Sequence, residues 1–244
     1  MTAITPSEAT AIAKNAYIFT YPLVASYRAM CSEAADPSST SYNGGFGKWL
    51  HQRTTTTTES ATIATCTATL RSSAWLDLRA EPWVVSTPTL GSGCSGLTRT
   101  YDLWTFLIAE TGACESDEVA DSTNVLLASP TWLGDFDDHI GHVARGDSGF
   151  VHCEALIYCD DPCDEAQISE IQRRYTLEPL SAHVDRRSGP SPDVIPGSVD
   201  VETSTSYWAT ANAALALTTP NDQDRAMLSR IADIGVISGE PWDA

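Results

Sequence analysis

The stretch Arg71-Ser72-Ser73-Ala74-Trp75-Leu76-Asp77-Leu78 decides the fold class, because it is the densest strand-like run in the chain. Its small and aliphatic residues alternate with Trp75 and Asp77, which is the two-residue period of a β-strand. Glu81-Pro82-Trp83-Val84-Val85 follows at once and predicts a second strand, which Pro88 ends. Two strands this close together indicate a sheet in the middle of the chain.

Further segments alternate between apolar and polar residues and predict more strands. These segments are 61–71, 97–108, 124–128, 140–143 and 150–159. Arg71 falls on the threonine face of the first of them, and Asp102 shares a face with Trp104. His152 and Glu154 share one face of the last segment, whose other face is wholly apolar. We therefore expect a sandwich of short antiparallel strands.

Helices are predicted on both sides of these strands. Thr5-Pro6-Ser7-Glu8 has the pattern of a capped helix start, and apolar residues then recur at helical spacing as far as Met30. Pro22 lies inside this helix and is expected to kink or split it, because proline lacks an amide donor. Helical patterns also cover residues 164–175, 207–217 and 219–234.

These elements predict a single α+β domain around a central antiparallel β-sandwich, with a helical N-terminus and a helical C-terminus. We divide it into an N-terminal helix, a loop or lid, the sandwich core and a helical C-terminal part. The corresponding ranges are 1–35, 36–60, 61–160 and 161–244.

Composition excludes several classes of partner. The 244 residues carry a formal net charge of −18, so the surface repels nucleic acid and anionic membranes. No apolar run approaches the roughly 20 residues that a membrane span needs, and no basic segment leads into an apolar one. We expect a soluble, cytoplasmic protein that binds neither nucleic acid nor membrane.

The seven cysteines predict reduced thiols in a reducing compartment, because a disulfide framework more often has an even count. One group could be considered as a metal site, namely His152, Cys153, Cys159 and Cys163. Its spacing lacks the paired Cys-x-x-Cys units of zinc sites, so we predict no metal. Glycine-rich phosphate loops are also missing, and we expect no cofactor.

Polar residues on otherwise apolar strand faces are the candidates for chemistry. Arg71 would bind or polarise an oxygen, and Asp102 or the pair of His152 and Glu154 would move a proton. The alternative for Asp102 is a structural carboxylate paired with Arg71, and the alternative for the His152 face is exposure to solvent. Substrate-binding candidates are Tyr21, Cys66, Trp75 and Trp104.

Blocks of sequence along nearly the whole chain carry a family resemblance. They are Ala16-Tyr17-Ile18-Phe19-Thr20-Tyr21-Pro22-Leu23, Thr69-Leu70 with 72–78, residues 82–88, Asp102-Leu103-Trp104-Thr105, residues 175–180, and residues 234–239 with Trp242-Asp243. In this order they resemble domain-of-unknown-function family 1254. The resemblance implies a jelly-roll sandwich flanked by helices, often fused to a second jelly-roll domain that is expected to be absent here.

The chain also departs from the pattern of that family. Members resemble one another in a Pro-Asn-x-Asp-Thr-Leu-Tyr run, where this chain has Thr65-Cys66-Thr67-Ala68-Thr69-Leu70-Arg71. A tyrosine pair expected shortly before Asp102 is replaced by Ser95 and Gly96. If the replaced groups serve the family's chemistry, this chain has either a rebuilt pocket or no activity.

Two functions follow as expectations. The first is a diverged, cofactor-independent enzyme of specialised metabolism. It would act on a small, largely apolar molecule by proton transfer or cyclisation. The second is a non-catalytic module that binds a small molecule or assembles with itself. A missing fusion domain would leave apolar surface uncovered, so we also expect a homo-oligomer, most simply a dimer.

Overall fold

The computed structural model describes residues 4–52, 70–91, 93–113, 123–136, 140–159, 165–183 and 205–243. Its helices are α1 (Pro6–Met30), α2 (Glu165–Arg173), α3 (Leu180–His183), α4 (Ser206–Leu215) and α5 (Arg225–Ile231), with a π-helical turn η1 (Cys31–Ala35) and 3-10 turns η2 (Asp222–Asp224) and η3 (Ala232–Ile234). Its strands are β1 (Leu50–His51), β2 (Leu70–Asp77), β3 (Trp83–Thr87), β4 (Cys94–Asp102), β5 (Leu107–Ala113), β6 (Thr123–Ala128), β7 (His142–Arg145), β8 (Phe150–Cys159) and β9 (Thr176–Pro179).

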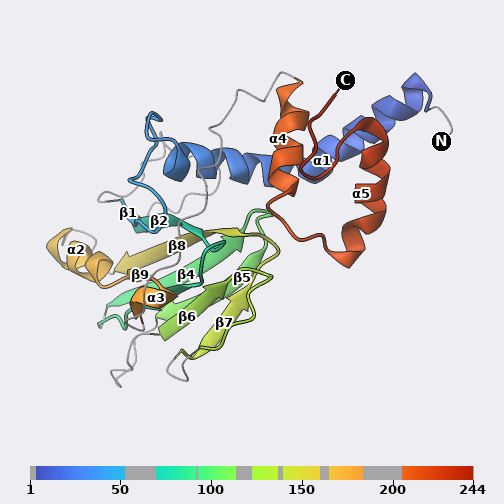
Figure 1. Ribbon diagram of the computed structural model, residues 1–244. Helices are drawn as coiled ribbons and strands as arrows, with labels where there is room; N and C mark the ends of the chain where they lie inside the picture. The colour runs from blue at the N-terminus through green and yellow to red at the C-terminus, as the bar shows by residue number, and fades with distance from the viewer. Residues whose placement is uncertain are drawn as a thin grey trace.

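The strands form two sheets that face each other, with the helices gathered outside them (Figure 1). One sheet has the order β1-β2-β8-β4-β5 and is antiparallel throughout. The other has the order β7-β6-β3-β9 and is antiparallel except where β6 pairs with β7. Leu76 and Val151 of the first sheet share a buried cluster with Val85 and Leu127 of the second. The expected α+β class with a sandwich-like core is confirmed.

The pairing of β2, β8 and β4 sets which side chains share the outer face of the first sheet. Trp75 lies opposite His152, which lies opposite Tyr101 on the far side of β8. Glu154 lies two residues along β8 and therefore on the same face as His152. Alternation sends Cys153 to the inner face, where it is buried between the sheets.

Helix α1 covers this outer face, and α4 and α5 lie beside it (Figure 1). A capping box between Thr5 and Glu8 fixes its start, as the sequence predicts. The helix is uninterrupted from Pro6 to Met30, so the expected split at Pro22 does not occur. Leu23 and Met30, which follow the proline, are fully buried in the main core, and this packing holds the helix together across the missing amide.

The predicted strand 97–108 is in fact a hairpin, so that expectation is wrong in its second half. β4 ends at Asp102 and β5 begins at Leu107, and the two strands pair with each other. The turn contains no glycine or proline, and Thr105 adopts a positive φ of 67° there. A β-branched residue in this conformation is an outlier, which is why no turn was apparent from the sequence.

The C-terminal helices agree with the sequence patterns. α4 covers most of the expected helix 207–217, and η2, α5 and η3 together cover most of 219–234. Gly235 ends the last turn at a φ of 80°, which suits glycine. The expected strand at 61–69, with Cys66, lies outside the described residues, as does Cys163. Among the described helices, none is long and apolar enough to cross a membrane.

Candidate functional site

A cavity of about 430 Å³ lies between α1 and the outer face of the first sheet. The residues from the sheet are Arg71, Trp75, Tyr101, His152 and Glu154. The residues from α1 and η1 are Ala25, Ser26, Ala29 and Glu33, and the β4–β5 turn contributes Asp102 and Thr105. We call the sheet side the floor and the helix side the roof. The volume is in the range of small-molecule sites, which is roughly 300–1,000 Å³.

Alternation along three paired strands builds the floor. Arg71, Trp75, His152, Glu154 and Tyr101 occupy alternate positions that point to one side of the sheet. The rings of Trp75 and His152 lie 4.7 Å apart between centroids. Four of the five floor residues were expected as site residues from the sequence, and the cavity brings all four together.

Arg71 and Glu154 form an ion pair across β2 and β8. The guanidinium Nε lies 2.5 Å from Oε1 of Glu154. The side chain of Glu154 is 19% exposed to solvent, and the side chain of Arg71 is 39% exposed. A guanidinium has five N–H donors, so the pair leaves Arg71 with donors that a bound molecule can use.

His152 is held in its neutral form by its surroundings. Burial, and secondly the positive charge of Arg71, lowers the pKa of His152 from 6.5 to about 4. Neutral imidazole has one nitrogen that accepts a proton and one that donates. At neutral pH, His152 is therefore able to act as a general base toward a molecule in the cavity.

The lowered pKa of His152 predicts a loss of stability in acid. Between pH 6.5 and about 4, the unfolded chain binds a proton at this residue and the folded chain does not, so acidification favours unfolding. We expect His152→Gln to remove about 2–3 kcal/mol of the difference in unfolding free energy between pH 7 and pH 4.5. Denaturant unfolding at both pH values measures this difference. His142→Gln, at an exposed position on β7, is the matched control, and an equal effect there would contradict the assignment.

The roof was not anticipated from the sequence. Ala25, Ser26 and Ala29 are small residues on one side of α1, and their size leaves the cavity open. Glu33 follows on the π-helical turn, where its Oε2 accepts a hydrogen bond of 2.8 Å from Nε1 of Trp75. Helical spacing places Ser26 and Ala29 on the same side of the helix, but no sequence signal relates that side to the strands.

Asp102 lies at the edge of the cavity, but its partners are not those expected. Its Oδ1 accepts a hydrogen bond of 2.9 Å from the Phe106 amide, and its Oδ2 accepts one of 3.4 Å from the Asp147 amide. Burial raises the pKa of Asp102 above 3.8, although these backbone donors oppose the shift. The expected Arg71–Asp102 pair is therefore wrong, because Arg71 pairs with Glu154 and backbone amides of two turns satisfy Asp102.

The close approach of Asp147 to Asp102 depends on Gly146. A Cβ atom at Gly146 would lie 2.9 Å from Cβ of Asp102, which is closer than such atoms approach. Glycine therefore allows the β7–β8 connection to approach the β4–β5 turn closely. Asp102 fixes the geometry of that turn, which makes its role structural.

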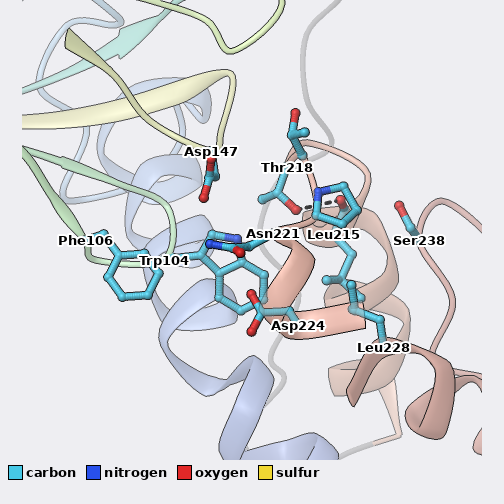
Figure 2. Close-up of a pocket in the computed structure, with 11 residues that line it drawn as sticks. Trp104, Phe106, Asp147, Leu215, Thr218, Asn221, Asp224, Leu228 and Ser238 are labelled. Carbon is cyan, nitrogen blue, oxygen red and sulfur yellow. Dashed lines mark hydrogen bonds between the residues drawn. The ribbon is translucent and has the colours of Figure 1, made fainter. Parts of the chain in front are cut away.

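Trp104 lines a different and much smaller cavity, shown in Figure 2. This cavity of about 30 Å³ lies where the β4–β5 turn meets the α4–α5 connection, with Asn221 and Leu228 on the helical side. This volume has room for water but not for a substrate-sized molecule. The ring centroids of Trp104 and Phe19 lie 5.2 Å apart. Tyr21 lies on α1, and its side chain is 53% exposed. Neither Trp104 nor Tyr21 lines the larger cavity, contrary to expectation.

The cysteines differ partly from expectation. Cys31 and Cys153 are buried and are not disulfide-bonded, whereas Cys94 is disulfide-bonded, so the expectation of reduced thiols is wrong for Cys94. His152 and Cys153, which were considered together as metal ligands, point to opposite faces of β8 and cannot bind the same ion. In the part of the chain that the structure describes, no three His, Cys, Asp or Glu side chains are placed to hold a metal.

Thiol labelling checks the state of these cysteines. When the protein is denatured without a reductant, we expect iodoacetamide to modify Cys31 and Cys153 and to leave Cys94 unmodified. Reduction before labelling should make Cys94 reactive as well. Peptide mass spectrometry reads each site separately, and labelling of Cys94 before reduction would contradict the disulfide.

The family of the chain follows from comparison with known proteins. A family model described as a protein of unknown function, DUF1254, matches residues 46–179, which is more than half of the chain. The chain belongs to this family. The matched range contains every floor residue of the cavity, and the DUF1254 range begins after the roof helix. No curated protein matches the sequence.

One solved structure supports the fold of this DUF1254 chain. The VPA0106 protein from Vibrio parahaemolyticus is similar with a TM-score of 0.75 at 20% identity, over 97% of this chain and 54% of that one. A putative uncharacterized protein from Burkholderia cenocepacia has a TM-score of 0.36 at 13% identity, over 74% of this chain and 44% of that one. The chain thus spans about half the length of the Vibrio protein, and the likeness concerns the fold alone.

Proposed function

We propose that this protein is a cofactor-independent enzyme that transfers a proton, or promotes a cyclisation through proton transfer, on a small and largely apolar molecule in the 430 Å³ cavity. One observation carries the proposal. A neutral histidine, an arginine–glutamate pair and two aromatic rings converge on one side of a rigid sheet, under a helix whose small residues leave room for a ligand.

Each floor residue has a role in this proposal. His152 accepts the proton from the bound molecule, because it is neutral at pH 7. Arg71 donates hydrogen bonds to an oxygen that gains negative charge, and Glu154 keeps the guanidinium in place. Trp75 and Tyr101 provide apolar walls against which the molecule is oriented.

A two-step experiment tests the proposal. A library of small molecules is first screened by thermal shift, because a specific ligand raises the unfolding temperature according to its occupancy. Each hit is then incubated with the protein in D2O, and NMR follows the exchange of its acidic C–H groups for deuterium. Exchange or conversion by the wild type supports an enzyme, and its absence for every hit would contradict proton transfer.

A binding module is the second candidate, and one observation favours it. Asp102, which was a candidate acid or base, is satisfied by backbone amides, and Arg71 is already paired with Glu154. A protein that uses these groups only to shape the cavity would bind ligands without changing them. Hits that stabilise the wild type without exchange or conversion would favour this candidate.

Oligomeric state and location remain part of the proposal. Tyr17, Ile18 and Tyr21 on α1 are 42%, 62% and 53% exposed, which supports self-association into a dimer through this helix. Light scattering that finds a monomer at high micromolar concentration would contradict it. The disulfide at Cys94 argues against the predicted cytoplasmic location, because disulfides are rare in that compartment.

A further inference from the structure

The roof of the cavity carries a negative charge that the proposed catalytic groups do not use. Glu33 lines the cavity, and its Oε2 accepts a hydrogen bond from the neutral indole of Trp75. The carboxylate of Glu154 is offset by Arg71. Among the described residues that line the cavity, Arg71 alone has a permanently positive side chain. Glu33 therefore leaves the cavity with an excess of negative charge.

A carboxylate in a cavity needs a counter-charge or solvent, because an unpaired charge away from water is unfavourable. Within the described chain, the Glu33 carboxylate accepts its hydrogen bond from an indole N–H, which does not neutralise the charge. The whole protein has a formal net charge of −18, so its field concentrates cations near the cavity and repels anions. Both the local and the global charge favour the same kind of ligand.

The aromatic lining favours that kind of ligand as well. Trp75 and Tyr101 line the cavity next to His152, and the faces of aromatic rings attract cations. His152 adds a second feature that points to a ligand. Its ring lies in the cavity, is half-buried and makes no hydrogen bond to another described residue. A bound molecule would supply the partner that this polar group lacks.

We infer that the ligand of this cavity is a small organic cation, namely an amine with an apolar or aromatic body. Its ammonium group binds Glu33 beside the ring of Trp75, and its body lies over the floor within reach of His152. The inference rests on the proposal that this cavity binds a small molecule, and it names the charge of that molecule. Arg71 then holds Glu154 in place and donates hydrogen bonds to an oxygen of the ligand that is neutral when the ligand binds.

Three probes that share one body and differ in the head group test the inference. They are 2-phenylethylamine, 2-phenylethanol and 3-phenylpropanoate, each titrated by calorimetry at low salt. We expect the amine to bind at least tenfold more tightly than the alcohol, and the carboxylate to bind most weakly. The preference should shrink as salt is added, because salt screens the attraction.

Glu33→Gln is the decisive variant, because glutamine removes the charge while its amide oxygen can still accept the hydrogen bond from Trp75. We expect it to weaken binding of the amine about tenfold or more and to leave binding of the alcohol unchanged. Glu170→Gln on α2 is the matched control, since Glu170 is 65% exposed and does not line the cavity. Unliganded melting curves show whether each variant is folded.

Other outcomes overturn the inference in distinct ways. Tighter binding of the carboxylate, lost in Arg71→Gln, would make the ligand an anion and would leave the proposed function intact. Equal binding of amine and alcohol would remove any role for the charge of Glu33. No binding by any probe up to about 10 mM would reject this class of ligand, whereas the library screen described above would still test the proposed function.

Discussion

Replacing Asp102 with alanine is expected to lower the free energy of unfolding by about 2–4 kcal/mol. The carboxylate is 2% exposed and accepts hydrogen bonds from the amides of Phe106 and Asp147. Its removal leaves two donors without a partner, and a buried donor without a partner costs roughly 1–3 kcal/mol. Urea unfolding at pH 7 measures the change.

Two controls sharpen this result. Asp102→Asn keeps an oxygen for the Phe106 amide, so its effect should be less than half that of alanine. Asp233→Ala replaces an exposed aspartate and should change stability by no more than about 0.5 kcal/mol. Asp102→Ala with unchanged stability would show that the β4–β5 turn does not depend on this carboxylate. Because Arg71 pairs with Glu154, replacing Asp102 does not leave an arginine without its carboxylate partner.

The largest effect on activity is expected from His152→Gln. Under the proposed function, it lowers the rate of proton exchange on a bound molecule by about 10²–10⁴-fold, which is the usual contribution of a positioned general base. Glutamine is close in size and polar, but it cannot take up a proton near neutral pH. NMR in D2O gives the rate at saturating ligand, and calorimetry gives the affinity.

Comparison of rate with affinity separates chemistry from binding. If His152 is the base, the rate falls while the affinity changes by less than about tenfold. The rate of wild type should also fall in acid with an apparent pKa near 4, where His152 takes up a proton. A rate that persists in His152→Gln would exclude this residue as the base, and His142→Gln should match the wild type throughout.

The floor of the cavity could be predicted from the sequence because it depends on a local rule. Alternation along residues 150–159 places His152 and Glu154 on one face whatever the rest of the chain does. Trp75 and Arg71 follow from the same rule on β2. Which strands are neighbours is a matter of long-range pairing, and this is why Tyr101, opposite His152 on β4, was missed.

The remaining differences come from tertiary contacts. The face of His152 was as compatible with solvent as with a pocket, because only the docking of α1 covers it. The partners of Asp102 are backbone amides, which every residue has, so no residue type points to them. The turn after Asp102 uses Thr105 in a conformation that favours glycine, and tertiary contacts outweigh that local preference.

The roof and the floor of the cavity come from two separate segments of the chain, the N-terminal helix and the strands that follow it. Lys48 is exposed on the connection between them, so a protease that cuts after lysine can separate the roof from the floor. The two fragments would then be held together by packing alone. A molecule that contacts both would add up to about 2.7 kcal/mol to their association at a hundred times its Kd. Retention of the N-terminal fragment after such a cut would then report occupancy of the cavity without any knowledge of the reaction.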